Sequence, residues 1–173
     1  SEISIVDKIY WLIEECKTYG TLPFAGVARA GFIAIQFVRS FVDIGILTKD
    51  EMDRFMNSMD TINKKMTRDW MKCQLGMMEK QEFLEKYGHI RPGTYDIMSP
   101  RYDEKFEEYF SLSEEKSAAG KVIEGVSSDI FDEYKLRQIQ MQLDENGLEI
   151  TAMELLTFIR EAVEGREYSK YVF

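Results

Sequence analysis

The chain has 173 residues, of which 45% are hydrophobic and 13% aromatic, so it can form a packed core and is not globally disordered. Its net charge of −9 disfavours nucleic acid and anionic lipid surfaces as partners, because their phosphates would be repelled. Cys16 and Cys73 lie far apart with no Cys/His cluster around them, which disfavours a zinc site and indicates a reducing compartment.

The sequence shows no signal peptide and, as we interpret it, no apolar run long enough to span a bilayer, so we expect a cytoplasmic location. It begins with Ser1 rather than Met and stops at Phe173 inside an apolar run without a helix stop signal. We therefore expect residues 1–173 to be a single helical domain that is a piece of a longer, multi-domain chain.

The first 44 residues predict two helices. Residues 3–17 carry apolar side chains at helical spacing, which indicates one buried face, and the stretch 19–23 with Gly20 and Pro23 predicts a break. Residues 24–44 are apolar almost all round, which is typical of a central helix. The few polar residues of this second helix form a narrow stripe that must face a polar partner or a wet cleft: Arg29, Gln36, Ser40 and Asp43.

The middle of the chain predicts shorter helices. Gly45 ends the central helix, and Thr48 with Glu51 forms a capping box for the next one. That helix carries methionines on one side, which we interpret as core, and it either continues or restarts at Thr61 before ending at Gly76. Residues 81–87 predict a further short helix that Gly88 stops.

Residues 88–103 differ from the rest because they hold two Pro, two Gly, two Arg, two Asp and the only His, without helical periodicity. Loops of this length are uncommon in compact domains unless they have a function, so an ordered loop is expected. After it, helix resumes at 103–110, residues 113–128 are a weak helix or mobile loop, and 129–143 are helical. Asn146 and Gly147 turn the chain, and Thr151 with Glu154 caps a last helix.

The expected fold is therefore all-α: an irregular helical bundle of about six to eight helices with one long ordered loop, residues 88–103, and no convincing strand. No dinucleotide, P-loop, nucleophile-elbow, catalytic-triad or metalloprotease motif occurs. Adjacent carboxylates such as Glu107 and Glu108 point in different directions and indicate solvated surface. We accordingly expect no catalytic residues and no metal ligands within this chain.

Residues 83–104, with the sequence FLEKYGHIRPGTYDIMSPRYDE, resemble a motif in the middle segment of phosphoenolpyruvate synthase-like and pyruvate, phosphate dikinase-like proteins, which are similar in layout to rifampicin phosphotransferases. Residues 19–25 (YGTLPFA), with Ala28, Arg29 and 32–34, and residues 166–171 (REYSKY) fit the same group. The similarity is spread over most of the chain, and the loop is its most specific part.

The resemblance implies a three-part, ATP- and Mg-dependent parent enzyme. An ATP-grasp-like domain would bind ATP, a swivelling domain would carry a phosphorylated His, and this chain would be the helical segment that holds an acceptor or links the other two. The Gly-rich Thr/Ser-x-Ser-His run of the phosphohistidine domain is missing here, so His89 is not expected to be the phosphocarrier. No cofactor is expected in the chain itself.

The candidate substrate- or phosphate-binding residues are those of the loop together with one from the central helix: Arg29, His89, Arg91, Tyr95, Asp96 and Arg101. Arginine suits such a site because its planar guanidinium pairs with phosphate or carboxylate at two atoms at once. The alternative is that Arg91 and Arg101 pair with Asp96, Asp103 or helix ends and only fix the loop.

Two functions remain open on the sequence. The chain is either the acceptor-binding or linker domain of a phosphotransferase, or a non-catalytic helical module that docks neighbouring domains or protein partners. Arginines that converge on an open concavity would favour the first, and arginines that are each buried against a carboxylate would favour the second.

Overall fold

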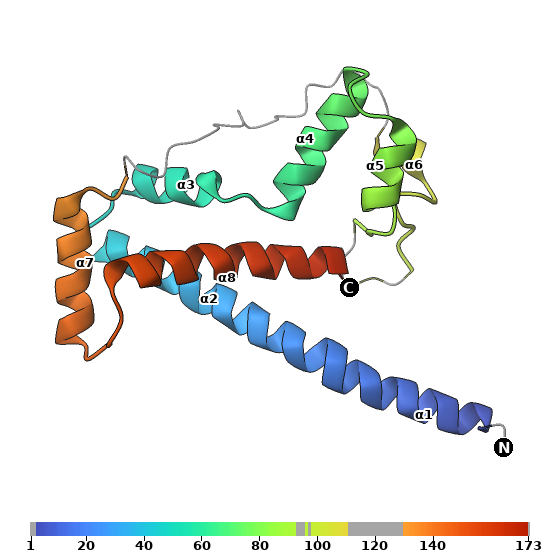
Figure 1. Cartoon of the computed structure of the whole chain (residues 1–173), viewed down its shortest axis with the longest axis horizontal. Helices are drawn as coiled ribbons and strands as arrows, with labels where there is room; N and C mark the ends of the chain where they lie inside the picture. The colour runs from blue at the N-terminus through green and yellow to red at the C-terminus, as the bar shows by residue number, and fades with distance from the viewer. Residues whose placement is uncertain (1–2, 93–95, 97, 111–129, 173) are drawn as a thin grey trace.

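The computed structural model describes residues 3–92, 96, 98–110 and 130–172 (Figure 1). Over these residues the chain is all-α and contains no strand, as the sequence predicts. The elements in chain order are α1 (Ile5–Glu15), the π-helical turn η1 (Cys16–Thr21), α2 (Leu22–Asp43), α3 (Lys49–Ser58), α4 (Ile62–Gln74), α5 (Lys80–Tyr87), α6 (Phe106–Tyr109), α7 (Glu133–Glu145) and α8 (Ala152–Val172). Residues 113–128, expected to be weak helix or loop, lie outside the described residues.

The predicted break at residues 19–23 is wrong, because α1, η1 and α2 form one uninterrupted helix (Figure 1). Pro23 has no N–H to bond the carbonyl four residues earlier, which would interrupt an ordinary α-helix. The wider π turn absorbs this defect: the N–H of Leu22 bonds the carbonyl of Lys17, five residues back. Pro23 then occupies the first turn of α2, where proline is tolerated.

The main core lies where the C-terminal half of α2 crosses α8. Helix α2 buries one side there, with Gly31, Ala34, Val38 and Phe41. At Gly31 the backbone comes so close to α8 that an added Cβ would lie 2.7 Å from Cδ of Arg166. The crossing therefore depends on a residue without a side chain at position 31.

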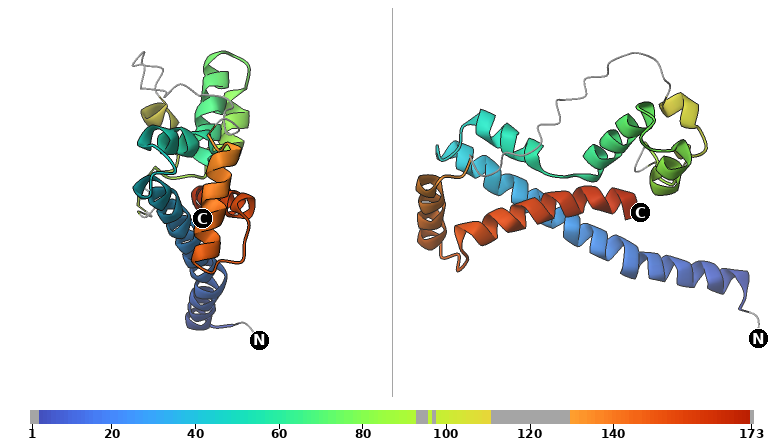
Figure 2. Two further views of the ribbon diagram at one scale, coloured as in Figure 1. Left: turned by 90° about the vertical axis from the view of Figure 1, so that its left-hand side faces the viewer. Right: turned by 45° about the horizontal axis from the view of Figure 1, so that its top comes forward.

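The central helix is α8, not the segment 24–44 that the sequence favours. Helix α8 buries residues along its length, whereas residues 22–30 of α2 include no buried residue, and Phe32 and Ile33 further along α2 are 58% and 45% exposed. The predicted buried face of residues 3–17 is also wrong, because α1 contains no buried residue. In Figures 1 and 2, α1 projects beyond the other helices with the N-terminus at its far end.

Helices α3 and α7 complete the main core. Phe55 and Met59 are buried in the same cluster as Ile139 and Leu143, so the predicted core role of the methionine-bearing side of α3 is confirmed for Met59. The helix restarts after Thr61 rather than continuing, which fixes one of the two alternatives left open.

Several of the predicted start and stop signals of helices are confirmed. Thr48 and Glu51 form the capping box of α3. At the start of α8, the N–H of Glu154 donates to Oγ1 of Thr151, while the N–H of Thr151 donates to the Glu154 carboxylate. Gly76 and Gly147 take positive φ angles of 68° each, which an ordinary side chain disfavours.

A second, aromatic cluster joins α4, α5 and α6. Trp70 packs against Phe83, Phe106 and Phe110 with ring centroids 5.1 to 5.7 Å apart. Tyr171 near the end of α8 also contacts the cluster. This aromatic cluster positions the loop that follows α5.

The continuous helix Ile5–Asp43 is long and apolar enough to cross a membrane by length and composition, with a mean hydropathy of 1.4 over its most apolar window. This corrects the prediction that no such run exists. A single helix of this kind is weak evidence for a membrane span, and the cytoplasmic location stays a prediction from the sequence.

Candidate functional site

The loop that follows α5 is closed at its base by backbone hydrogen bonds. The N–H of Tyr102 donates to the carbonyl of Ile90, and the N–H of Asp103 donates to the carbonyl of Gly88, both at 3.0 Å. Gly88 is buried, and a Cβ there would lie 2.4 Å from the carbonyl oxygen of Leu84. The loop therefore leaves and rejoins the bundle at one narrow point.

Two of the predicted site residues meet at Ser99. Nε of Arg91 donates to the Ser99 carbonyl at 2.9 Å, and the Asp96 carboxylate accepts from the Ser99 hydroxyl at 3.1 Å. Asp96 also accepts from the N–H of Met98 at 2.9 Å, which makes a local turn. These contacts stabilise the loop itself. Tyr95, another candidate in the loop, lies outside the described residues.

Arg101 is held by neighbouring carboxylates. Its guanidinium donates two hydrogen bonds to Asp103, at 3.0 and 2.9 Å, in the two-atom geometry that arginine favours. Glu104 lies 3.7 Å from its Nε and accepts from its backbone N–H at 2.8 Å. The arrangement matches the alternative in which Arg101 pairs with Asp103 and fixes the loop.

His89 connects the loop to the end of α8. Its Nε2 lies 2.7 Å from the carbonyl oxygen of Tyr171, which can only accept, so Nε2 carries the proton in this contact. The two rings pack edge to face with centroids 4.9 Å apart. His89 thus supplies a donor to a carbonyl in the last turn of α8, where free carbonyls need one.

An open depression of about 430 Å³ lies beside His89, lined by Gln81, Leu84, Glu85, His89 and Asp103. Its ionisable lining consists of two carboxylates and the imidazole, and the guanidinium that reaches Asp103 is already paired with it. Such a lining would repel phosphate rather than attract it. The depression does not have the chemistry of an anion-binding site.

Arg29 is exposed on α2, on the part of the helix that precedes the α8 crossing. Within the described parts of the chain, no hydrogen bond or ion pair connects it to Arg91, Asp96 or Arg101. The structure therefore brings together Arg91 with Asp96, and it leaves Arg29 apart from them. The three arginines do not converge on one cavity.

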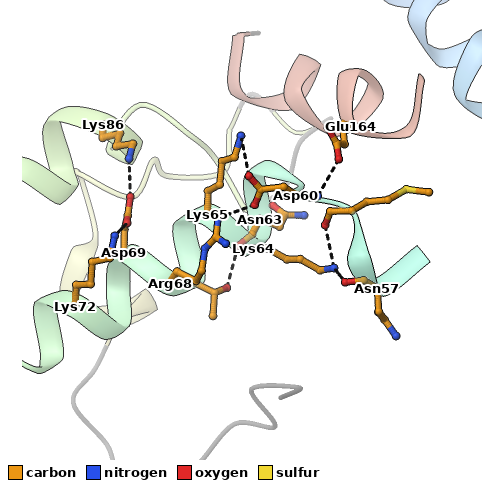
Figure 3. Close-up of polar contacts among 12 residues, drawn as sticks. Asn57, Asp60, Asn63, Lys64, Lys65, Arg68, Asp69, Lys72, Lys86 and Glu164 are labelled. Atoms are coloured by element: carbon orange, nitrogen blue, oxygen red, sulfur yellow. Dashed lines mark hydrogen bonds and ion pairs between the residues drawn. The ribbon is translucent and has the colours of Figure 1, made fainter. Parts of the chain in front are cut away.

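The most buried polar site in the described residues is one that the sequence did not indicate, centred on Asp69 of α4 (Figure 3). Asp69 is 5% exposed, and its carboxylate accepts from Nζ of Lys72 at 2.7 Å and Nζ of Lys86 at 2.6 Å. The hydroxyl of the fully buried Tyr87 donates a third bond at 2.8 Å. The site ties α4 to α5 beneath the loop.

The ionisation of this site follows from its contacts. Burial alone would raise the pKa of Asp69, but the hydrogen bonds from Lys72, Lys86 and Tyr87 outweigh it and hold the pKa well below its usual range. Burial, followed by the bond to the carboxylate, raises the pKa of Tyr87 to about 12. Asp69 is thus a fixed anion whose acceptor positions are occupied, which suits a structural role and not proton transfer.

A second polar junction, also drawn in Figure 3, connects α3, α4 and α8. Lys64 donates to the carbonyls of Asn57 and Met59 at the end of α3, and burial lowers its pKa. The N–H of Asp60 donates to Glu164 of α8 at 2.9 Å, and the Asp60 carboxylate pairs with Arg68 at 2.6 Å. These charges hold the turn between α3 and α4 in place.

Local sequence could have indicated only part of these sites. Lys72 follows Asp69 at helical spacing, which favours contact on one face of α4. Lys86 and Tyr87 lie in a different helix, and nothing in the sequence indicates that α5 packs against this face. In the described residues no group of three or more His, Cys, Asp or Glu side chains could hold a metal ion.

Comparison with known proteins does not identify a family for this chain. No protein-family model matches the chain, and neither a curated protein nor a solved structure shows detectable similarity to it.

Proposed function

We propose that this chain is the helical linker or acceptor-binding domain of an ATP-dependent, phosphoenolpyruvate synthase-like phosphotransferase that works through a phosphohistidine in another domain. The observation that carries the proposal is the sequence of residues 83–104, which resembles the middle segment of that group. Two contacts of this stretch support it: the loop is closed at its base by backbone hydrogen bonds, and His89 bonds it to α8.

In this role, the chain's own residues hold the loop in position and take no part in the reaction. Arg91 and Arg101 are engaged with Ser99 and Asp103, and the His89 imidazole is engaged with a backbone carbonyl. The described residues offer no acidic cluster for Mg²⁺ and no Gly-rich phosphate loop for ATP, so neither group fits here. ATP and the reactive histidine would belong to the ATP-grasp-like and phosphohistidine domains of the same parent chain.

The coding sequence around residues 1–173 tests the class directly. The proposal expects it to encode an ATP-grasp-like domain and a domain with a Gly-rich Thr/Ser-x-Ser-His run. A reading frame that encodes neither domain would overturn it.

A labelling experiment on the full-length protein tests the role of His89. With ATP labelled at its phosphates, wild type and His89→Asn should both acquire acid-labile phosphate, because His89 is bonded to the Tyr171 carbonyl and is not the carrier. The isolated 173-residue chain should acquire none. Loss of the label in His89→Asn alone, in a variant that folds normally by circular dichroism, would contradict this assignment.

The second candidate is a non-catalytic helical module that docks neighbouring domains or protein partners. The projecting, uncovered apolar helix α1 and the pairing of Arg101 with carboxylates favour it. Thermal shift with phosphate, pyruvate and phosphoenolpyruvate separates the two. Stabilisation by any of these anions that Arg91→Ala removes, and that the surface control Arg137→Ala retains, would favour acceptor binding over pure docking; no stabilisation would favour docking or linking.

A further inference from the structure

Helix α1 presents a two-heptad apolar stripe to solvent. Ile5, Ile9, Leu12 and Cys16 follow one another at intervals of four, three and four residues, the spacing of the core positions of a coiled coil. All four are exposed, with Ile5 at 75% and Leu12 at 64%. The stripe is therefore an uncovered face of a helix that is already formed.

The two flanks of this stripe differ in chemistry. One flank carries Val6 and Ile13, both exposed and both apolar. The other flank carries Lys8 and Glu15, which are seven residues apart and opposite in charge. Within the described part of the chain neither of these two side chains has an ion-pair partner, whereas Glu14 next to them pairs with Lys17.

We propose that α1 pairs with α1 of a second copy of this chain in an antiparallel arrangement. In antiparallel helix pairs, each flank faces the same flank of the partner. The apolar stripes then interdigitate, with Ile9 beside Leu12 of the second copy and Ile5 beside Cys16 of the second copy. This proposal does not depend on the phosphotransferase assignment.

The charges of Lys8 and Glu15 favour the antiparallel orientation over the parallel one. In the antiparallel pair, Lys8 lies beside Glu15 of the second copy, and by symmetry the contact occurs twice; the other flank pairs Val6 with Ile13. In a parallel pair, Lys8 would face Ile13 of the second copy, which leaves the ammonium against an apolar side chain. Only the antiparallel arrangement is complementary on both flanks.

The charge of the chain favours a protein partner over a lipid surface. A helix that binds a membrane surface typically carries Lys and Arg on its polar side, whereas α1 carries Asp7, Glu14 and Glu15 against Lys8 and Lys17. The chain as a whole has a net charge of −9, which adds to repulsion from anionic lipid. A second copy covers the apolar stripe and supplies the opposite charge beside Lys8 and Glu15.

Sedimentation velocity of the 173-residue chain tests the pairing. We expect a reversible dimer between about 1 and 100 µM, since a contact this short falls in the small interface class. Lys8→Glu and Glu15→Lys should each weaken dimerisation by about tenfold or more, because each turns two attractive contacts into repulsive ones. The double variant Lys8→Glu/Glu15→Lys should restore dimerisation, and the charge-matched control Glu14→Lys should leave it unchanged within about threefold.

Cross-linking tests the orientation in a Cys73→Ala background. In the antiparallel pair, the two Cys16 residues lie about 16 Å apart along the axis at a rise of about 1.5 Å per residue, too far for a disulfide. Mild oxidation should therefore cross-link Ile5→Cys to Cys16 of the second copy and leave the protein without Ile5→Cys uncross-linked.

Four outcomes would overturn the proposal. They are a monomer at every concentration, a dimer that the charge reversals do not weaken, a Cys16–Cys16 disulfide between copies, and flotation of the chain with phosphatidylcholine vesicles in place of dimerisation. The charge variants and Ile5→Cys change exposed residues of α1, and Cys73→Ala removes only a thiol from a half-buried position of α4, so circular dichroism should show wild-type helix content in each.

Discussion

The buried carboxylate of Asp69 offers the sharpest test of the packing between α4 and α5. Substitution Asp69→Asn keeps the shape of the side chain but removes the charge that Lys72 and Lys86 approach at 2.7 and 2.6 Å. Hydrogen bonds to charged groups contribute about 1.5–3 kcal/mol each. The two lysine side chains are 49% and 47% exposed and regain water when released, so the expected loss is about 2–3 kcal/mol in total.

Urea denaturation at pH 7 measures this loss. Fluorescence of Trp70 reports on the aromatic cluster once the exposed Trp11 has been replaced by Phe. A loss of about 2–3 kcal/mol corresponds to a decrease in Tm of roughly 5–10 °C for a chain of this size. The control Asp50→Asn breaks an exposed pair with Arg54 and should cost no more than about 0.5 kcal/mol.

The stability difference between wild type and Asp69→Asn should depend on pH in one direction. Because the pKa of Asp69 is lowered in the folded state, its contribution is complete above its ordinary value of 3.8 and is lost as the pH falls toward the folded pKa. The stability gap between wild type and Asp69→Asn should thus be constant from about pH 7 to 5 and shrink below about pH 4. A gap under about 1 kcal/mol at pH 7, or one that does not change with acidification, would refute the reasoning.

Three further predictions concern single positions. Glu51→Gln should cost about 2 kcal/mol at pH 7, because Lys135 and the capping contacts lower the pKa of Glu51 to about 2; the cost should fall between about pH 4.5 and 2, as measured by urea denaturation. Gly88→Ala should cost about 2 kcal/mol or more in the same assay, since its Cβ would meet the Leu84 carbonyl, and an unchanged midpoint would contradict the packing at the loop base. Gly147→Ala should cost about 1 kcal/mol from its φ of 68° alone, and Gly147→Asn clearly less; equal effects would argue against backbone strain.

Local features of the fold were predictable from the sequence because their causes lie within a few residues. The capping residues Thr48 and Thr151 and the stop at Gly76 were placed correctly, since each depends on the first or last turn of a helix. The all-α class followed from the same apolar periodicity that defined the helices.

The features that the sequence did not predict depend on contacts between distant segments. Apolar periodicity marks a face that can be buried but does not say which helix covers it, so the central place was assigned to residues 24–44 and not to α8. Pro23 predicted a break by the ordinary rule, and the π turn that bypasses it depends on a hydrogen-bond register that composition does not reveal.

The candidate site was predicted in part. That Arg101 pairs with Asp103 was one of the two alternatives, because the residues are close in sequence. That His89 bonds the end of α8, eighty-two residues away, and that Arg29 stays apart from the loop required the fold itself. The Asp69 site was not predicted for the same reason, since two of its three donors come from α5.

The absence of a side chain at Gly31 has a consequence for the whole molecule. Helix α8 reaches the loop at its far end through Tyr171 and His89, and it passes within van der Waals distance of α2 at Gly31. A methyl group at position 31 would push α8 away from α2 at the crossing. Because α8 is one continuous helix, its displacement would increase with distance from the crossing. We therefore expect a methyl group at the buried position 31 to alter the contact between Tyr171 and His89, although no residue of the loop would be changed.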